Sequence, residues 1–430
     1  MNAAVRNRFT RRFSGPKDKA ASLLRRIEVQ GSFASAYADI QSEPTKAEWK
    51  GLISQALQTF EALPFTASLD ELEAAVSKAE EIMAPIGAEA KTCTIHCVGH
   101  GHIDMNWMWS WPETVAATHD TFASVLSLMK QVPGVTYSQS QASVYALIEK
   151  YHPEMFAEIQ ERVKEGVWEV AAAHWVEGDK NLAHGESIAR HLLYTRQYFK
   201  EKFGLEPEDV PIDWEPDTFG HANTLPGILA KGGVKFYYCC RPGGGHDHGR
   251  IGDERPRLFW WQGPDGSRVL VNRESTWYNS YVNIGDNIAE ALVPFARETG
   301  LKDWLNVYGW GNHGGGPTLT EVRYLQETAT WPIYPKVIFG TVKGYFETIL
   351  PQLPETLAVL DHELNFEFTG CYTSQSAIKR ANRFGEAYCL DAETLALVAN
   401  SLTGREVPKE QLREAWINVL FNQFHDILPG

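Results

Sequence analysis

The chain has 430 residues, of which 43% are hydrophobic, and a formal net charge of −14. This length allows a large buried core and two or three domains, and the composition is typical of a globular protein. The negative charge argues against nucleic acid or an anionic membrane as a partner, because both would repel such a surface. The 14 tryptophans exceed what core packing needs, and such a surplus is common where sugar rings stack.

The first part of the chain is predicted to be helical. Apolar residues recur at helical spacing in 52–63 and again from Leu69 to Met83, with a break at Pro64. We therefore expect an N-terminal helical accessory region over residues 1–90.

From residue 91, short apolar runs alternate with longer amphipathic segments. Helices are expected between most of the runs, for example over 113–130 and 186–203. This alternation predicts an α/β domain over residues 91–350, with a parallel sheet or barrel and helices outside it. The expected strands are 93–98, 135–138, 167–173, 211–214, 235–239, 305–308 and 337–340.

The last part of the chain changes to long helices, expected over 374–402 and 409–424. They predict the start of a C-terminal helical bundle over residues 351–430. Because the sequence stops soon afterwards, we interpret it as truncated, with bundle partners missing. Apolar helix faces would then be exposed, and we expect poor stability or a homo-oligomer as the consequence.

Two features bear on the compartment. The six cysteines form no CxxC pair and lie mostly in apolar runs, which favours reduced core thiols over a disulfide framework or a zinc finger. The N-terminus has no continuous apolar stretch long enough for a signal peptide or a membrane span. We expect a cytoplasmic protein.

Polar and glycine-rich stretches follow several expected strands, where α/β folds place their reactive residues. His102 and Asp104 follow the first strand, and in an extended segment both side chains point the same way, as two ligands of one metal ion require. The alternative is a surface turn. Asp217 should enter the same cleft after its own strand, and its alternative role is a helix N-cap.

Other polar residues allow a functional or a structural interpretation. Glu177 and Asp179 either hydrogen-bond the cleft or face solvent, and His221 is more typical of a structural histidine than of a ligand. His246 and His248 lie in a glycine-rich loop, where adventitious metal binding is the more plausible reading.

Six stretches occur in a particular order: GHGHIDMNWMW, EGDKNLAHGES, PDTFGHAN, GNHGGGPT, GCYTSQSAIKR and NQFHDILPG. Together they resemble the α-mannosidases of glycoside hydrolase family 38, from about Thr92 to the end of the chain. The cytoplasmic and bacterial-type branch is the more similar one. The resemblance implies a seven-stranded βα barrel, then a helical bundle and β-sandwich domains, and retaining hydrolysis of terminal α-mannosyl residues of oligosaccharides.

The resemblance also implies roles for individual residues. One zinc ion would be held by His102, Asp104, Asp217 and His425, and Asp217 would be the nucleophile that forms a covalent mannosyl-enzyme. The residues expected to contact the substrate are Trp107, Phe219, Asn312, His313 and Tyr372.

One position departs from the family pattern. Many members have an aspartate as acid/base in the glycine-rich loop, where this chain has Asn312. An amide cannot act as a general acid, so His313, Asp361 or Glu363 would have to serve instead. Two alternatives also stay open: a zinc polysaccharide deacetylase, and a mannose-binding relative without turnover.

Overall fold

The computed structural model describes residues 19–64, 66–242, 255–274, 277–280, 284–286, 288–365 and 367–430. His246 and His248 lie outside these residues. The chain divides into one unit of residues 1–97, 282–306 and 319–339 and a second of 98–281, 307–318 and 340–430. The division predicted from the sequence, at residues 90 and 350, is drawn along the chain and stays a prediction.

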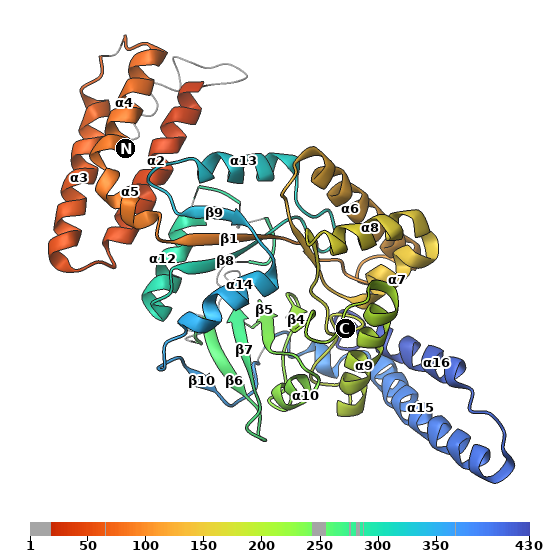
Figure 1. Cartoon of the computed structure of the whole chain (residues 1–430). Coiled ribbons are helices and arrows are strands. Elements are labelled where there is room, and N and C mark those ends of the chain that lie inside the picture. The colour runs from red at the N-terminus through yellow and green to blue at the C-terminus, as the bar shows by residue number, and fades with distance from the viewer. Residues whose placement is uncertain are drawn as a thin grey trace. The chain divides into compact units, whose positions relative to one another are not determined.

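The first unit begins with a group of helices that lie side by side (Figure 1). Their apolar stripes supply buried residues such as Leu24, Phe33, Phe60 and Leu72. Ser68 starts one helix with a capping box, in which its hydroxyl accepts from the Glu71 amide and the Glu71 carboxylate accepts from the Ser68 amide. The helices are α2 (Lys19–Ala38), α3 (Glu43–Glu61), α4 (Leu69–Ile82) and α5 (Ala84–Ala90).

A three-stranded sheet in the order β8-β1-β9 completes this unit. Its strands are β8 (Asp303–Tyr308), β1 (Thr94–Gly99) and β9 (Lys336–Phe339), and β1 pairs with β9 in parallel. Helices α12 (Ile288–Thr299) and α13 (Leu319–Ala329) belong to the same unit. The last two residues of β1 and of β8 are assigned to the second unit. His102 follows β1 after two residues.

The second unit contains two further sheets, with orders β10-β6-β7-β5-β4 and β2-β3. All of their pairings are parallel except that of β6 with β7, which form an antiparallel hairpin. The strands are β2 (Tyr137–Gln139), β3 (Trp168–Val170), β4 (Ile212–Glu215), β5 (Phe236–Cys239), β6 (Leu258–Gln262), β7 (Arg268–Arg273) and β10 (Val359–Leu360).

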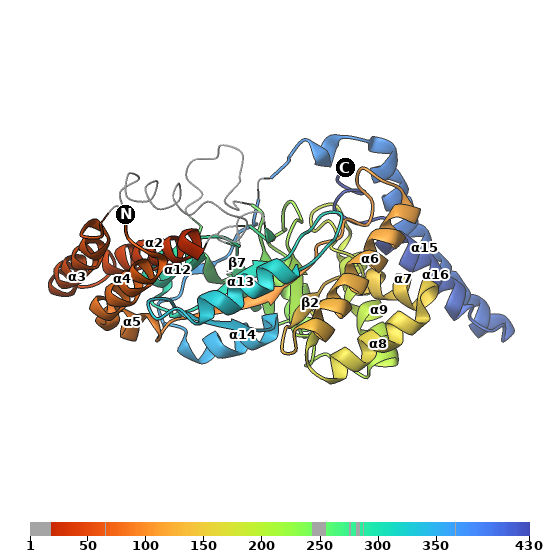
Figure 2. The same ribbon diagram turned by 90° about the horizontal axis from the view of Figure 1, so that it is seen from above.

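The second unit also contains helices (Figure 2). They are α6 (Trp111–Gln131), α7 (Ala142–Tyr151), α8 (Pro153–Lys164), α9 (Gly185–Phe203), α10 (Leu225–Lys231), α14 (Val342–Ile349), α15 (Ser376–Thr403) and α16 (Lys409–Phe421), with short 3-10 turns η1 (Leu350–Gln352) and η2 (Cys371–Thr373). The expected α/β character with helical content is therefore confirmed. A closed seven-stranded barrel is not shown, because the hydrogen-bond ladders of the described residues group the strands into three separate sheets.

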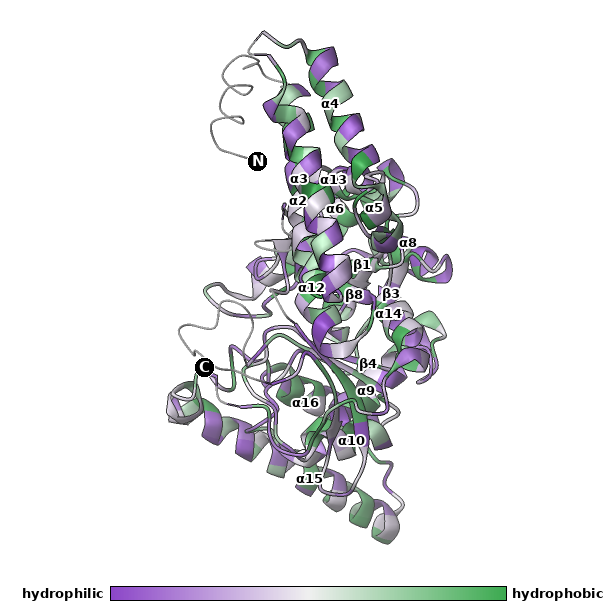
Figure 3. Cartoon of the chain, turned by 90° about the vertical axis from the view of Figure 1, so that its left-hand side faces the viewer, coloured by the Kyte–Doolittle hydropathy of each residue, from purple (hydrophilic) through white to green (hydrophobic). Residues whose placement is uncertain are grey.

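Helices α15 and α16 lie side by side in both views (Figures 1 and 2). The Arg190 guanidinium of α9 holds the Glu393 carboxylate of α15 through two hydrogen bonds of 2.8 and 2.7 Å. Beyond Glu393, α15 exposes large apolar side chains, among them Leu395 at 67% and Leu402 at 79%, and Figure 3 shows the mixture of apolar and polar residues along it. No helix among the described residues combines the length and hydropathy needed to cross a membrane.

Candidate metal and active site

The ends of two strands deliver three of the predicted site residues. His102 and Asp104 follow β1, are buried at 1% and 2% exposure, and reach the site through Gly99 and Gly101. A Cβ at Gly101 would come within 2.8 Å of the Tyr137 hydroxyl, so only glycine lets the chain pass here. Asp217 follows β4, and because α10 begins only at Leu225, Asp217 is not the helix N-cap that was its alternative role.

The segment after α16 delivers the fourth residue. His425 is fully buried, and its backbone amide donates to the Glu177 carbonyl at 3.2 Å. An isolated bridge between Gly178 and Phe424 fixes the two segments beside each other. His425 is therefore positioned by main-chain pairing with the residues that follow β3.

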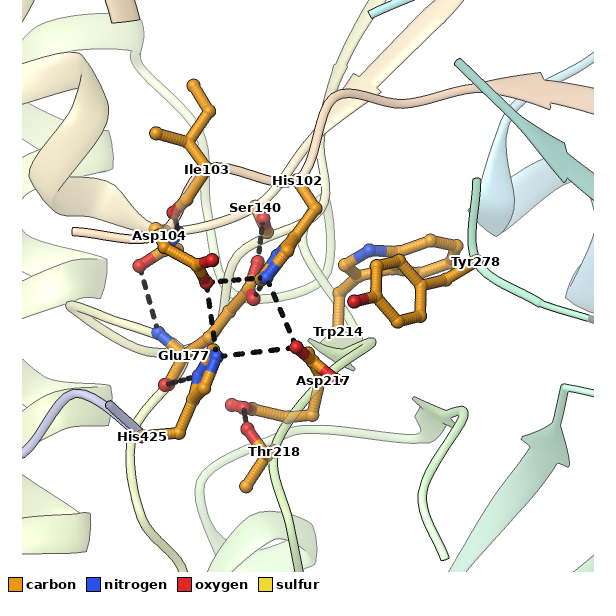
Figure 4. Close-up of polar contacts among 12 residues, drawn as sticks. His102, Ile103, Asp104, Ser140, Glu177, Trp214, Asp217, Thr218, Tyr278 and His425 are labelled. Atoms are coloured by element: carbon orange, nitrogen blue, oxygen red, sulfur yellow. Dashed lines mark hydrogen bonds and ion pairs between the residues drawn. The ribbon is translucent and has the colours of Figure 1, made fainter. Parts of the chain in front are cut away.

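The four side chains point toward one another (Figure 4). Asp104 Oδ1 lies 2.9 Å from His102 Nε2 and 3.4 Å from His425 Nε2. Asp217 Oδ2 lies 3.9 Å from His102 Nε2 and 4.0 Å from His425 Nε2. One ligand atom from each of the four residues lies within 4.8 Å of all the others, and all four residues are buried.

This geometry fits a metal ion. His102 Nε2, His425 Nε2 and Asp104 Oδ1 are buried atoms without a hydrogen-bond partner among the described residues. Buried polar atoms are rarely left in this condition unless they bind something. A tetrahedral ion about 2.1 Å from each ligand would separate the ligand atoms by about 3.4 Å, within the range of the observed separations. The set of two imidazoles and two carboxylates could hold a divalent cation.

The charges around the site also favour a bound cation. Burial by itself would lower the pKa values of His102 and His425, but the surrounding carboxylates reverse this. Glu177 and Asp104 raise the pKa of His102 well above its usual range, and Asp426 and Asp104 raise the pKa of His425 to about 9. Burial would raise the pKa of Asp104, yet the two histidines lower it. The carboxylates thus favour positive charge at this place.

Arg241 fixes the orientation of Asp217. Its Nε donates to Asp217 Oδ1, which leaves Oδ2 facing the two histidines. The guanidinium lies 4.8 Å from the ring centre of Phe368, and both members of the ion pair are only 12% exposed. Arg241 follows β5 as Asp217 follows β4, so the strand-end pattern could have identified it from the sequence.

The glycine-rich loop lies beside the metal ligands through Asn312. The carbonyl of Asn312 accepts from the Asp104 amide at 2.8 Å, and its side-chain Oδ1 accepts from the Tyr278 hydroxyl at 3.0 Å. Asn312 has a φ of +70°, a conformation that asparagine tolerates better than most residues. Tyr278 was not identified from the sequence, and its ring stands edge-on to His102 at 5.2 Å.

The other predicted contact residues lie at different depths. Phe219 is buried, with its ring 5.6 Å from that of His425. Trp107 is 51% exposed, and His313 is exposed with its Nε2 2.9 Å from Glu113 Oε1. The Tyr372 hydroxyl accepts from Asn181 Nδ2 at 3.1 Å. Phe219 thus lies beside His425, whereas Trp107 and His313 are exposed. We call these two residues, together with Trp109 and Trp310, the rim.

The remaining candidate acids are exposed to solvent. The Asp361 side chain is 80% exposed, and Glu363 is also exposed. His221 has the contacts of a structural histidine, as expected from the sequence. Its Nδ1 accepts from the Tyr237 hydroxyl at 2.7 Å, and its Nε2 donates to the Arg241 carbonyl at 3.0 Å. Its ring is fully buried, and burial lowers its pKa to about 3.

Two family models together match most of the chain. The N-terminal domain model of glycosyl hydrolases family 38 matches residues 92–368, and the alpha mannosidase middle domain model matches residues 367–430. Alpha-mannosidase 2C1 of Homo sapiens is 31% identical over 342 residues, which are 78% of this chain and 32% of the relative. An alpha-mannosidase of Saccharomyces cerevisiae is 30% identical, again over 78% of this chain and 32% of the relative.

A solved alpha-mannosidase structure from Enterococcus faecalis V583 superposes with a TM-score of 0.68 at 22% identity, covering 79% of this chain and 39% of that chain. The likeness supports the fold. This chain spans about a third of the length of the curated relatives it matches. On the strength of the domain match, the chain belongs to glycosyl hydrolase family 38.

Proposed function

We propose that the chain carries the site of a zinc-dependent retaining α-mannosidase, which hydrolyses terminal non-reducing α-mannosyl residues of oligosaccharides. The observation that carries this proposal is the convergence of His102, Asp104, Asp217 and His425, with unpartnered ligand atoms facing one another. The alpha-mannosidase relatives support the substrate class. The deacetylase alternative has no comparable support from the family match.

Zinc is the ion we propose, because two imidazole nitrogens and two carboxylate oxygens suit it and because it accepts further oxygen ligands. His102, Asp104, Asp217 and His425 would hold one ion per chain. When bound, zinc would supply Lewis acidity toward the hydroxyls of the sugar.

Asp217 would act as the nucleophile. Its carboxylate oxygen would form a bond to the anomeric carbon while the bond to the leaving oxygen breaks, and water would later release mannose with retained configuration. Arg241 supports this role because its Nε donates to Oδ1 and so orients the carboxylate. Phe219 would form an apolar wall of the sugar site beside His425.

The leaving oxygen needs a proton, and here Asn312 favours a second candidate function. Its amide lies beside the ligand set where the family resemblance places an acid, and it cannot donate as one. His313 is at the rim, and Asp361 and Glu363 are exposed. A relative that binds mannose without turnover is therefore the alternative, and a slow enzyme that needs good leaving groups lies between the two.

The rim supports a sugar substrate larger than one ring. Trp107 and Trp310 expose 51% and 42% of their surfaces, and Trp109 packs edge-on against His313 at 4.7 Å. Flat aromatic faces next to imidazole and carboxylate groups suit the stacking and hydrogen bonding of pyranose rings. We propose that they contact the parts of the oligosaccharide beyond the terminal mannose.

We also propose a cytoplasmic location. All six cysteines are free, and five of them are buried. Free thiols are typical of proteins that work in a reducing compartment.

A trapping experiment tests the proposed chemistry. A 2-deoxy-2-fluoro-mannosyl donor with a good leaving group should form a long-lived adduct, and peptide mass spectrometry should locate it on the peptide that contains Asp217. Proton NMR of a turned-over aryl α-mannoside should show α-mannose as the first product. Saturable mannose binding with neither adduct nor product would instead support the binding relative.

A further inference from the structure

Glu177 contacts both histidines of the proposed metal site. It follows β3 and is 1% exposed, and its side-chain Oε2 lies 2.8 Å from Nδ1 of His102. Its main-chain carbonyl accepts a hydrogen bond from Nδ1 of His425 at 2.8 Å. One residue therefore meets each imidazole on the nitrogen opposite to the one that faces the other ligands (Figure 4).

Glu177 is itself held in place. Its second carboxylate oxygen, Oε1, accepts from the Ser140 hydroxyl, and its amide donates to the Gln141 side-chain oxygen at 3.1 Å. Ser140 and Gln141 follow β2, which pairs in parallel with β3. The ends of these two strands thus build a second layer behind the residues that come from β1 and β4.

No other described residue offers a hydrogen bond to the two atoms through which Glu177 and His102 meet. His102 Nδ1 and Glu177 Oε2 form a buried ion pair at 2.8 Å, and neither atom has a hydrogen-bond partner among the described residues. A buried carboxylate without a partner is costly, so the pair constrains the ring of His102. A proton on Nδ1 leaves the lone pair of Nε2 free for a metal, and such outer partners commonly set the orientation of metal-bound histidines.

We propose that Glu177 is a positioning residue for the metal site, which orients both imidazoles and directs their Nε2 lone pairs toward the ion. The inference rests on the proposed metal site. It extends that site to a residue whose side chain serves His102 and whose main chain serves His425. Because a substitution changes only the side chain, it should disturb His102 and leave the contact to His425 in place.

The test compares zinc binding by the wild-type chain, Glu177→Gln and Glu177→Ala. Affinity is measured on metal-free protein by competition with a chromophoric chelator, and the rise in melting temperature caused by zinc is measured in parallel. We expect Glu177→Gln to bind zinc about 10-fold more weakly and Glu177→Ala up to about 100-fold more weakly. The zinc-dependent rise in melting temperature should shrink accordingly.

Glu169→Gln is the matched control. Glu169 lies on β3 and, like Glu177, accepts from a serine hydroxyl, that of Ser138, but it otherwise accepts from the amides of Val342 and Lys343. This variant should lower the melting temperature with and without zinc by the same amount.

The outcomes separate the two proposals. If Glu177→Gln is folded and binds zinc as tightly as the wild type, the role of Glu177 is refuted and the metal site stands. If the wild-type chain itself binds no zinc, both are refuted. A purely structural role would lower both melting temperatures equally and leave the affinity unchanged, which also overturns the inference.

Discussion

The contribution of His425 can be tested by removing its imidazole. The ring is fully buried against Phe219 and His102, and its Nε2 lies 3.4 Å from Asp104 and 4.0 Å from Asp217. Substitution by glutamine keeps most of the volume and removes the nitrogen ligand. His425→Gln therefore changes the metal site more than it changes the packing.

The magnitude follows from the number of ligands. Four-ligand zinc sites in small proteins bind with about 10–16 kcal/mol, so one ligand of four contributes on the order of 3 kcal/mol. That value corresponds to a loss of about 100-fold in zinc affinity.

The assay is a chelator competition at pH 7.5, with circular dichroism as the check on folding. His96→Gln is the control, because it replaces a buried histidine on β1 whose Nε2 lies 2.9 Å from Asp303 Oδ1, outside the four ligands, and it should leave zinc affinity unchanged. A folded His425→Gln chain that binds zinc within threefold of the wild type would refute the assignment of His425 as a ligand.

Three further predictions concern stability and substrate preference. Burial lowers the pKa of His221 from 6.5 to about 3, so the stability that neutral His221 contributes is complete above pH 6.5 and is lost as the pH falls toward 3. Relative to His221→Gln, the wild type should lose about 2 kcal/mol of unfolding free energy between pH 7.5 and 5. Urea titrations in which the two proteins lose the same unfolding free energy over this pH range would contradict this. Asn312→Asp should raise turnover of a mannose disaccharide at least 10-fold, because a carboxylic acid can donate the proton that the sugar leaving group needs. Turnover of an aryl mannoside, which has a better leaving group, should change less. An unchanged ratio of the two rates would show that residue 312 does not protonate the leaving oxygen. Gly309→Ala should lower the free energy of unfolding by at least about 2 kcal/mol, because Gly309 has a φ of +120° and an added Cβ would come within 2.0 Å of the His100 carbonyl oxygen. Gly134→Ala should lower it less, because Gly134 has a φ of +91° but open space around it. Equal urea midpoints for the two variants would contradict the steric reasoning.

Much of the fold could be predicted because apolar runs and strand ends are local signals. Each of the seven expected strands is present, as β1, β2, β3, β4, β5, β8 and β9. The hairpin of β6 and β7 was missed, although Asp265 and Gly266 at its turn are a common hairpin signal. The predicted closed barrel depends on how the sheets meet, which the local patterns do not determine.

The site was partly predictable for the same reason. His102, Asp104 and Asp217 follow strands, so the strand-end rule brings them together, and the same rule applied to β5 would have added Arg241. His425 has no such signal, since main-chain pairing between Gly178 and Phe424 places it, and only the family resemblance indicated it. The role of Glu177 depends on contacts of its side chain and its carbonyl with two distant histidines, which no local pattern specifies.

The most direct test of the proposed zinc-dependent hydrolysis measures zinc content together with nitrophenol release from p-nitrophenyl α-mannoside, on this chain and on Asp217→Asn. We expect near one zinc per wild-type chain, turnover that is lost on chelation and restored by zinc, and no turnover by Asp217→Asn. A wild-type chain that releases nitrophenol without bound metal, or an Asp217→Asn chain that retains full turnover, would contradict it.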